Sequence, residues 1–293
     1  MKEWKTTNHR RDIICRTGKG NVPYLSFPLL EQCGIVHHGF STRMGGVSTG
    51  IFESMNLSFS RGDEESRVLE NFSRFGAAIG VKPQDMVFSK QTHTANVRVV
   101  TAEDRGKGIT RPVDYDHVDG LITDVPGLCL VTFFADCVPL FFVDPVKRAV
   151  GLSHSGWRGT VAKIGLETVN RMRETYGSRP SDILACVGPS ICQSCYEVSE
   201  DVIDAFREAY DKELWDELFY QKPDGKYQLN LWKANESVFL EAGILPEHIA
   251  VTNICTNCNP ELLYSHRASK GQRGSLAAFL ALKEERGTPC IHF

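Results

Sequence analysis

The sequence predicts an α/β fold made of one domain. Two continuous apolar runs, Leu128–Phe134 and Val138–Val143, are typical of strands that are buried on both faces of a sheet. Strand-like and helix-like segments alternate through most of the chain, and no repeat, low-complexity tract or linker-like composition separates them. We therefore expect an edge segment over residues 1–20 and a single α/β domain over residues 21–293.

The two apolar runs belong to the most informative stretch of the chain, residues 128–160. The sequence Ala135-Asp136-Cys137 separates the two expected strands, and a turn at Asp144-Pro145 leads to a third strand that ends at Ser153-His154-Ser155. Strand ends are rigid positions, and the loops beside them can approach a substrate. The thiol and the imidazole of this stretch therefore lie where reactive groups can be held.

Helical periodicity and turn residues predict the other elements. Val68, Phe72 and Phe75 recur at helical spacing, and Gly80 ends that segment. The polar, basic residues 1–20 are expected to form a ragged edge or an early strand, and the charged, turn-rich residues 101–116 a mobile loop. The remaining expected elements are, in order, a helix over 64–80, strands over 86–89, 96–101 and 118–123, a helix over 161–176, a strand over 182–187, helices over 200–210 and 229–242, and strands over 249–254 and 274–282.

The composition is ordinary for a soluble globular enzyme, with 42% hydrophobic and 24% charged residues among 293. The formal net charge of −3 and the lack of a basic run argue against nucleic acid as a partner. The start of the chain has no apolar signal segment, and every apolar run is shorter than the roughly 18 residues of a membrane helix. We expect a cytoplasmic protein with no membrane partner, a monomer or a homodimer, whose ten cysteines are mostly reduced.

Three residues that can bind a metal, His93, Cys137 and His154, each lie at an expected strand end among small residues. Imidazole and thiolate are ligands of zinc and copper, and three protein ligands with an open fourth position are the pattern of catalytic zinc. Because long segments separate the three residues, only the fold can bring them together. One buried cysteine and two hydrogen-bonded histidines would explain the same residues, and spacing alone favours that structural interpretation.

A second set of cysteines forms two C-x-x-C pairs, Cys192 with Cys195 and Cys255 with Cys258. Two such pairs resemble a structural zinc site. The segment between the pairs is far longer than a compact zinc ribbon uses and contains expected helices, so four reduced thiols are the favoured interpretation. A redox pair is an alternative that lacks the expected βαβ context.

The loop over residues 41–50 is rich in Gly, Ser and Thr, so its backbone can approach a ligand closely. Its Arg43 is either an anion ligand or an exposed turn residue. No Walker A or G-x-G-x-x-G sequence supports nucleotide binding of those kinds, and the H-E-x-x-H motif is absent. No histidine is followed two residues later by glutamate, as the base-deaminase signature requires.

Several sequence blocks together resemble the YfiH-like, laccase-domain family. They follow the family order from about residue 35 to the C-terminus, and the combination is specific although no single block is. The blocks are Phe40-Ser41-Thr42-Arg43 with Gly45-Gly46-Val47-Ser48, Gln91-Thr92-His93, Ala135-Asp136-Cys137-Val138-Pro139, His154-Ser155-Gly156-Trp157-Arg158-Gly159-Thr160, Gly188-Pro189-Ser190-Ile191 with Cys195-Tyr196-Glu197-Val198, Cys255-Thr256, and Tyr264-Ser265-His266-Arg267. Thr94, Ser153 and Ser155 depart from the residues that are commoner in the family, but all three are small and leave the ligands intact.

The resemblance implies a single-domain, mixed-sheet α/β sandwich related to the toxin-type cysteine deamidases. It also implies that His93, Cys137 and His154 bind one metal, usually zinc, with copper as the alternative. Family members are described as purine nucleoside enzymes that phosphorolyse adenosine, inosine and methylthioadenosine and deaminate adenosine. Others were first described as copper-dependent polyphenol oxidases, and one branch edits peptidoglycan precursors. Cys192 and Cys258 are not essential in the family, which weakens the case for a second zinc site.

The resemblance therefore implies a zinc enzyme whose substrates are purine nucleosides and phosphate. In deamination, zinc would lower the pKa of a bound water, and Asp136 or Asp119 could transfer protons, although Asp119 could instead cap a strand end. In phosphorolysis, a guanidinium group matches the phosphate oxygens, so Arg43 and Arg158 are the candidate phosphate ligands. Arg158 could instead pack against Trp157.

Other classes of function stay open. Cys137 could be a nucleophile and His154 its base in a hydrolase that cleaves an amide of a misincorporated peptidoglycan precursor, although zinc on the thiolate would compete. A copper oxidase of phenols is compatible with a His₂Cys site, but the His-x-His pairs of multicopper laccases do not occur among the nine histidines. A non-enzymatic binding module is the remaining class, and an inert site would support it.

Overall fold

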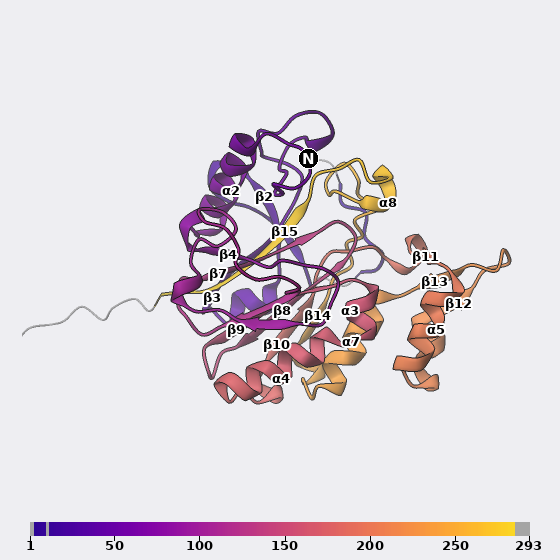
Figure 1. Cartoon of the computed structure of the whole chain (residues 1–293). Helices are drawn as coiled ribbons and strands as arrows, with labels where there is room; N and C mark the ends of the chain where they lie inside the picture. The colour runs from indigo at the N-terminus through magenta and orange to yellow at the C-terminus, as the bar shows by residue number, and fades with distance from the viewer. Residues whose placement is uncertain (1–2, 10–11, 285–293) are drawn as a thin grey trace, which may run out of the picture.

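Two six-stranded β-sheets pack face to face in this protein, and helices cover their outer faces (Figure 1). The computed structural model describes residues 3–9 and 12–284. The helices are α1 (Pro28–Gln32), α2 (Glu65–Ile79), α3 (Trp157–Val161), α4 (Ile164–Tyr176), α5 (Glu200–Ala209), α6 (Trp215–Leu218), α7 (Leu231–Glu241) and α8 (His266–Ser269). No helix in the described part of the chain has both the length and the apolar character needed to cross a membrane.

The first sheet has the strand order β1-β2-β3-β15-β7-β4. Its strands are β1 (Ile14–Thr17), β2 (Pro23–Ser26), β3 (Val36–Ser41), β15 (Leu276–Leu282), β7 (Cys129–Phe134) and β4 (Met86–Phe88). Neighbouring strands are antiparallel except β7 and β4, which are parallel. The last described strand of the chain thus lies in the middle of the sheet, and β1, within the expected edge segment, lies at its edge.

The second sheet has the strand order β14-β10-β8-β9-β6-β5. Its strands are β14 (Ile249–Val251), β10 (Leu184–Val187), β8 (Val138–Asp144), β9 (Ala149–Ser155), β6 (Gly120–Thr123) and β5 (Val97–Val99). The central pairs are antiparallel, while both edge pairs, β14 with β10 and β6 with β5, are parallel. A small third sheet joins β11 (Glu197–Val198), β13 (Tyr227–Leu229) and β12 (Phe219–Gln221).

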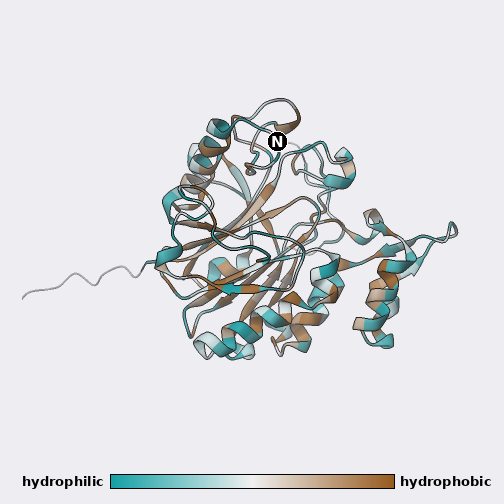
Figure 2. Cartoon of the chain, in the orientation of Figure 1, coloured by the Kyte–Doolittle hydropathy of each residue, from teal (hydrophilic) through white to brown (hydrophobic). Residues whose placement is uncertain are grey.

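The central strands are apolar on both faces because each face contacts a different layer. On β15, Leu280 packs between the two sheets while Phe279 packs against α2, 4.5 Å from the ring centroid of Phe75. On β8, Phe141 faces the first sheet and Phe142 faces α7. Figure 2 shows hydrophobic residues along these strands and hydrophilic residues on the outer sides of the helices.

The structure confirms the predicted mixed α/β fold and most of its elements. The apolar runs at 128–134 and 138–143 correspond to β7 and β8, and Gly80, with φ of 82°, ends α2. The helix expected over 161–176 corresponds to α4 but begins later, at Ile164, because Lys163 adopts φ of 53° between α4 and the short α3, which ends at Val161. Residues 101–116, expected to be a mobile loop, begin with a capping box and include a hydrogen bond from Tyr115 Oη to the carbonyl of Phe88.

Candidate active site

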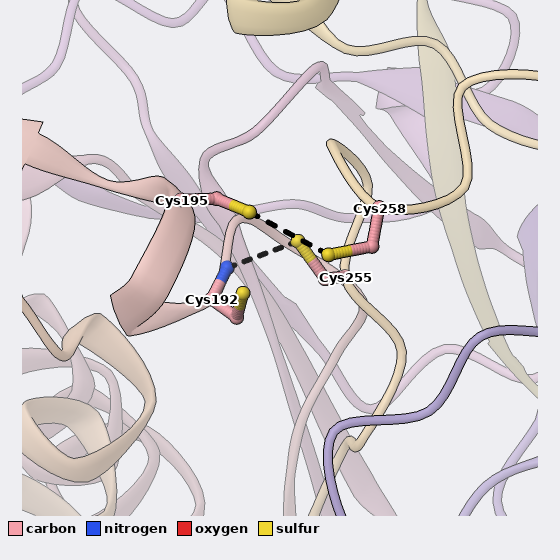
Figure 3. A group of neighbouring side chains, drawn as sticks. All are labelled: Cys192, Cys195, Cys255 and Cys258. Atoms are coloured by element: carbon pink, nitrogen blue, oxygen red, sulfur yellow. Dashed lines mark hydrogen bonds between the residues drawn. The ribbon is translucent and has the colours of Figure 1, made fainter.

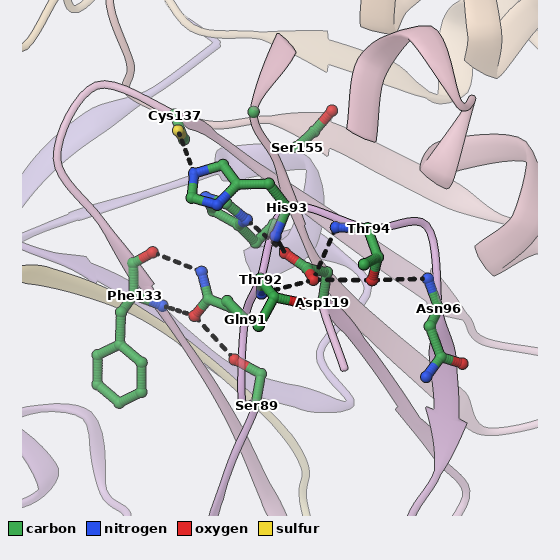
Figure 4. A network of polar contacts seen from close by, with 12 residues as sticks. Ser89, Gln91, Thr92, His93, Thr94, Asn96, Asp119, Phe133, Cys137 and Ser155 are labelled. Carbon is green, nitrogen blue, oxygen red and sulfur yellow. Dashed lines mark hydrogen bonds and ion pairs between the residues drawn. The ribbon is translucent and has the colours of Figure 1, made fainter. Parts of the chain in front are cut away.

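The three predicted metal ligands meet where the chain passes from one large sheet to the other. Cys137 lies in the short segment that connects β7 of the first sheet to β8 of the second. His93 lies in the loop that connects β4 to β5, which makes the same crossing, and His154 lies on β9 next to β8. The fold therefore brings together residues that are far apart in the sequence (Figure 4).

Their separations fit a single metal ion. One donor atom from each of His93, Cys137 and His154 lies within 4.8 Å of the other two. The Sγ of Cys137 is 3.9 Å from Nε2 of His93, and the two imidazole rings are nearly perpendicular, with centroids 4.9 Å apart. Zinc–sulfur bonds of about 2.3 Å and zinc–nitrogen bonds of about 2.0 Å in a tetrahedron separate ligand atoms by about 3.5 Å, so small side-chain movements suffice.

Asp119 positions both histidines. Its carboxylate is fully buried, and Oδ1 lies 2.8 Å from Nδ1 of His154 and accepts a hydrogen bond from the backbone N–H of His93. Oδ2 accepts hydrogen bonds from the backbone N–H groups of Thr92 and Thr94 and from the Thr94 hydroxyl (Figure 4). Because Asp119 occupies Nδ1 of His154, Nε2 is the nitrogen available to a metal.

The charges at the site favour an ionised thiol. Burial by itself would raise the pKa of Cys137, but the charge of His154 and hydrogen bonds from His154 and His93 lower this pKa to about 6. Burial would lower the pKa of His154, but the Cys137 thiolate and the Asp119 carboxylate raise it to about 9. Burial would also raise the pKa of Asp119, but its hydrogen bonds from His154 and Thr94 lower it to about 2. Asp119 thus stays ionised and is a positioning residue.

A pocket with a volume of about 660 Å³ opens beside the three ligands. Its lining includes both aromatic and cationic side chains, and the volume lies within the range of about 300–1,000 Å³ that is usual for small-molecule sites. The lining residues are Ser58, Phe59, Ser60, Arg61, Phe88, Ser89, Lys90, Gln91, His93, Gly108, Arg111, Pro112, Val113, Phe133, Phe134, Ala135, Cys137, His154, Arg273 and Ser275. Aromatic walls suit a flat base, and the cations suit an anionic group.

Two arginines of the pocket lie close enough to repel each other. Arg273 is 8% exposed, and its Nη1 donates hydrogen bonds to the carbonyl of Gly274 and the hydroxyl of Ser275. Its Nε is buried and has no hydrogen-bond partner within residues 3–9 and 12–284. Burial and the nearby charge of Arg61 lower the pKa of Arg273 to about 10. An anion in the pocket would relieve both the burial cost and the repulsion.

The structure does not bring the other sequence-predicted residues to this pocket. Arg43 donates hydrogen bonds to the backbone carbonyls of Glu53 and Pro260 and stacks on Tyr264, so it joins two segments of the fold. The guanidinium of Arg158 lies 4.2 Å from the ring centroid of Trp157, as its structural interpretation predicts. Neither arginine lines the pocket, so the expectation that they hold phosphate is not supported by their positions.

Asp136, expected to transfer protons, has both carboxylate oxygens engaged. Oδ1 accepts a hydrogen bond of 2.6 Å from Thr256 Oγ1, and Oδ2 accepts one of 2.7 Å from the backbone N–H of Arg267. With φ of 89° next to Cys137, Asp136 fixes the turn that carries the thiol. Sequence reasoning had no signal for Arg61 and Arg273, because isolated arginines in loops are common, and it placed Phe133 and Phe134 in the core of a strand.

Known proteins resemble this chain in sequence along most of its length. The family model described as multi-copper polyphenol oxidoreductase laccase matches residues 37–283. A relative named purine nucleoside phosphorylase YlmD, from Bacillus subtilis (strain 168), is 40% identical over 247 residues, which cover 84% of this chain and 88% of that protein. A relative named adenosine deaminase RL5, from an unknown prokaryotic organism, is 34% identical over 230 residues, which cover 78% of this chain and 87% of that protein.

Solved structures share the fold. The crystal structure of the hypothetical protein YfiH from Bacillus licheniformis superposes with a TM-score of 0.86 at 36% identity, covering 92% of this chain and 99% of that chain. The sequence blocks, the fold and the matched family model all agree. The chain therefore belongs to the multi-copper polyphenol oxidoreductase laccase family.

Proposed function

We propose that this protein is a zinc-dependent purine nucleoside enzyme that phosphorolyses adenosine, inosine and methylthioadenosine and deaminates adenosine. The observation that carries the proposal is the convergence of His93, Cys137 and His154 beside a pocket of about 660 Å³ with aromatic and cationic walls. The names of the relatives, purine nucleoside phosphorylase and adenosine deaminase, supply the substrate class.

Two imidazoles and one thiolate are a donor set that suits zinc and leave one coordination position for a ligand from solution. Zinc bound there would act as a Lewis acid that activates water or polarises a substrate atom. Other residues of the protein position the metal ligands. Asp119 fixes the tautomer of His154, and the same carboxylate holds the backbone of the loop that carries His93.

In this proposal, different residues of the pocket bind the base and the phosphate. Phe59, Phe88 and Phe133 offer apolar surface to a purine base and exclude water from it. Arg61 and Arg273 offer the positive charge that holds phosphate, taking the role that the sequence had suggested for Arg43 and Arg158. A phosphate oxygen held there would attack C1′ of the ribose, the bond from C1′ to the base would break, and the products would be the free purine and ribose 1-phosphate.

Deamination uses the same pocket without phosphate. Water adds to the purine carbon that bears the amino group, ammonia leaves, and adenosine becomes inosine. The buried Asp119 carboxylate, held against Nδ1 of His154, keeps this imidazole oriented.

The test is to incubate the zinc-loaded protein with adenosine, with and without phosphate, and to separate the products by chromatography. We expect adenine, hypoxanthine and ribose 1-phosphate only with phosphate present, and inosine as the product without phosphate. Cys137→Ser should abolish both activities, while Cys15→Ser, which alters an exposed cysteine, should leave them unchanged. Zinc-loaded protein that forms none of these products would contradict the proposal.

One observation favours a second candidate, an amide hydrolase with Cys137 as its nucleophile and His154 as its base. The shifted pKa values describe a thiolate next to a protonated imidazole, which is the state that such an enzyme uses. The predicted relation to toxin-type cysteine deamidases belongs to the same candidate and stays a prediction. Hydrolysis of an amide that survives chelation and is lost on thiol alkylation would favour this second function over the first.

A further inference from the structure

The four cysteines of the two C-x-x-C pairs form one cluster in the fold (Figure 3). The sulfur atoms of Cys192, Cys195, Cys255 and Cys258 all lie within 4.8 Å of one another. We call these four residues the four-cysteine cluster. None of the four is among the residues that line the pocket of the candidate active site.

Strand pairing explains how pairs so distant in the sequence meet. The parallel strands β10 and β14 are neighbours, with Val187 opposite Val251, so the loops that follow them leave the sheet at the same end. Ser190 and Cys255 then form a parallel β-bridge, and the backbone N–H of Thr256 donates a hydrogen bond to the carbonyl of Ser190. The long segment between the pairs, which argued against a zinc site in the sequence, forms separate helices and strands and does not keep the pairs apart.

The distances in the cluster match a metal tetrathiolate better than a disulfide. The Sγ atoms of Cys195 and Cys258 are 3.5 Å apart, whereas a disulfide bond is about 2.05 Å long. In a tetrahedral site with zinc–sulfur bonds of about 2.3 Å, neighbouring sulfur atoms are about 3.8 Å apart. The backbone N–H of Cys192 also donates a hydrogen bond of 3.2 Å to the sulfur of Cys255, which favours negative charge on that sulfur.

The four thiols lie close together, and Cys192 and Cys255 are buried. A divalent cation bound between them would favour the thiolate form of all four and hold their sulfur atoms together.

We propose that Cys192, Cys195, Cys255 and Cys258 bind one zinc ion, separate from the site formed by His93, Cys137 and His154. Four protein sulfurs complete a tetrahedron and leave no position for water or substrate, so this zinc is structural. It ties the loop after β10 to the loop after β14. The inference does not rest on the proposed purine chemistry.

The position of this zinc also gives it an effect on the active site. Thr256, next to Cys255, donates its hydroxyl hydrogen bond to Asp136, and the backbone N–H of Ile191, next to Cys192, donates to the carbonyl of Asp136. Asp136 immediately precedes Cys137. Loss of the structural zinc should therefore loosen the turn that holds the catalytic thiol.

The test is elemental analysis of metal bound by the full chain, purified under reducing conditions and dialysed against trace zinc. We expect two zinc ions per chain in the natural protein and one in Cys137→Ser. One is also expected in the double variant Cys195→Ser/Cys258→Ser, which changes the two less buried cysteines, and none when all three changes are combined. Cys33→Ser, a cysteine outside both sites, is the matched control and should keep two.

A cobalt titration of Cys137→Ser keeps the proposal testable if a cluster variant fails to fold. Cobalt bound by four thiolates should give strong sulfur-to-metal charge-transfer absorption at one equivalent, and zinc should displace it. Two results would overturn the proposal: natural protein that holds a single zinc which is lost in Cys137→Ser, or a disulfide between Cys195 and Cys258 found by mass spectrometry in protein kept under reducing conditions. Because the titration uses Cys137→Ser, its result is independent of any failure of the purine assay.

Discussion

Oδ1 of Asp119 lies 2.8 Å from Nδ1 of His154, and this contact determines which nitrogen of the imidazole can bind a metal. The same carboxylate accepts hydrogen bonds from the backbone of the loop that carries His93. One buried acid therefore orients two of the three ligands that the fold brings together. Substitution of Asp119 should therefore lower the metal affinity more than it lowers the stability of the fold.

Asp119→Asn should weaken zinc binding about 10–100-fold, the usual effect of losing a group that orients a metal-bound histidine. An amide has only one acceptor oxygen, so its NH₂ group would face the N–H groups of Thr92 and Thr94 or of His93 and His154. Competition with a chelator of known affinity measures the change. Thr92→Val is the control, because it keeps the backbone N–H that Asp119 accepts, and unchanged affinity in Asp119→Asn would contradict the positioning role.

The pKa of Cys137 predicts an unusual pH dependence of thiol alkylation in the metal-free protein. Only the thiolate reacts, and a pKa of about 6 means that the thiolate fraction rises as the pH increases through 6 and is near its maximum at neutral pH. The rate of iodoacetamide labelling at Cys137, followed by peptide mass spectrometry, should therefore have its midpoint near pH 6. Zinc should protect the thiol. A rate that still increases steeply above pH 8 would indicate an ordinary thiol.

The ligands of the candidate site could be predicted from the sequence because they adjoin strands with a clear signature. The apolar runs of β7 and β8 bracket Cys137, and the third strand of that stretch ends at His154. The strands are recognisable because both of their faces are buried. On β8, for example, Phe141 packs between the two sheets and Phe142 packs against α7. The local sequence thus placed the thiol and one imidazole correctly at the ends of strands.

The arginines that line the pocket could not be predicted, because their meeting depends on contacts between distant loops. Arg61 precedes α2 and Arg273 precedes β15, and nothing in the residues next to them indicates that they share a pocket. Arg43, in contrast, lies in a glycine-rich loop that suggests ligand binding, yet its guanidinium is satisfied by backbone carbonyls and Tyr264. The two C-x-x-C pairs were recognised in the sequence, but their meeting in one cluster could not be predicted, because it follows from the pairing of β10 with β14.

Arg273→Met should raise the KM for phosphate in phosphorolysis about tenfold or more, because a hydrogen bond to a charged group contributes about 1.5–3 kcal/mol. Methionine keeps most of the side-chain length and removes the charge. Deamination of adenosine without phosphate should change much less, and this difference separates loss of an anion ligand from general damage. Arg158→Met, outside the pocket, is the matched control. A raised KM for phosphate in Arg158→Met, with an unchanged KM in Arg273→Met, would instead identify Arg158 as the phosphate ligand.

Gly156→Ala tests how closely the ligands are packed. Gly156 has φ of −76°, which alanine adopts without strain, but an added Cβ would lie 2.8 Å from Cδ2 of His93 and 3.2 Å from Sγ of Cys137. The imidazole must therefore turn away from the thiol, and zinc affinity should fall at least tenfold. The thermal unfolding midpoint of the metal-free protein should change by only a few degrees, since a ΔΔG of 1 kcal/mol shifts it by roughly 2–4 °C in a chain of this size. A large loss of metal-free stability would show that Gly156 is required for folding, and unchanged zinc affinity would show that His93 can move without leaving the metal.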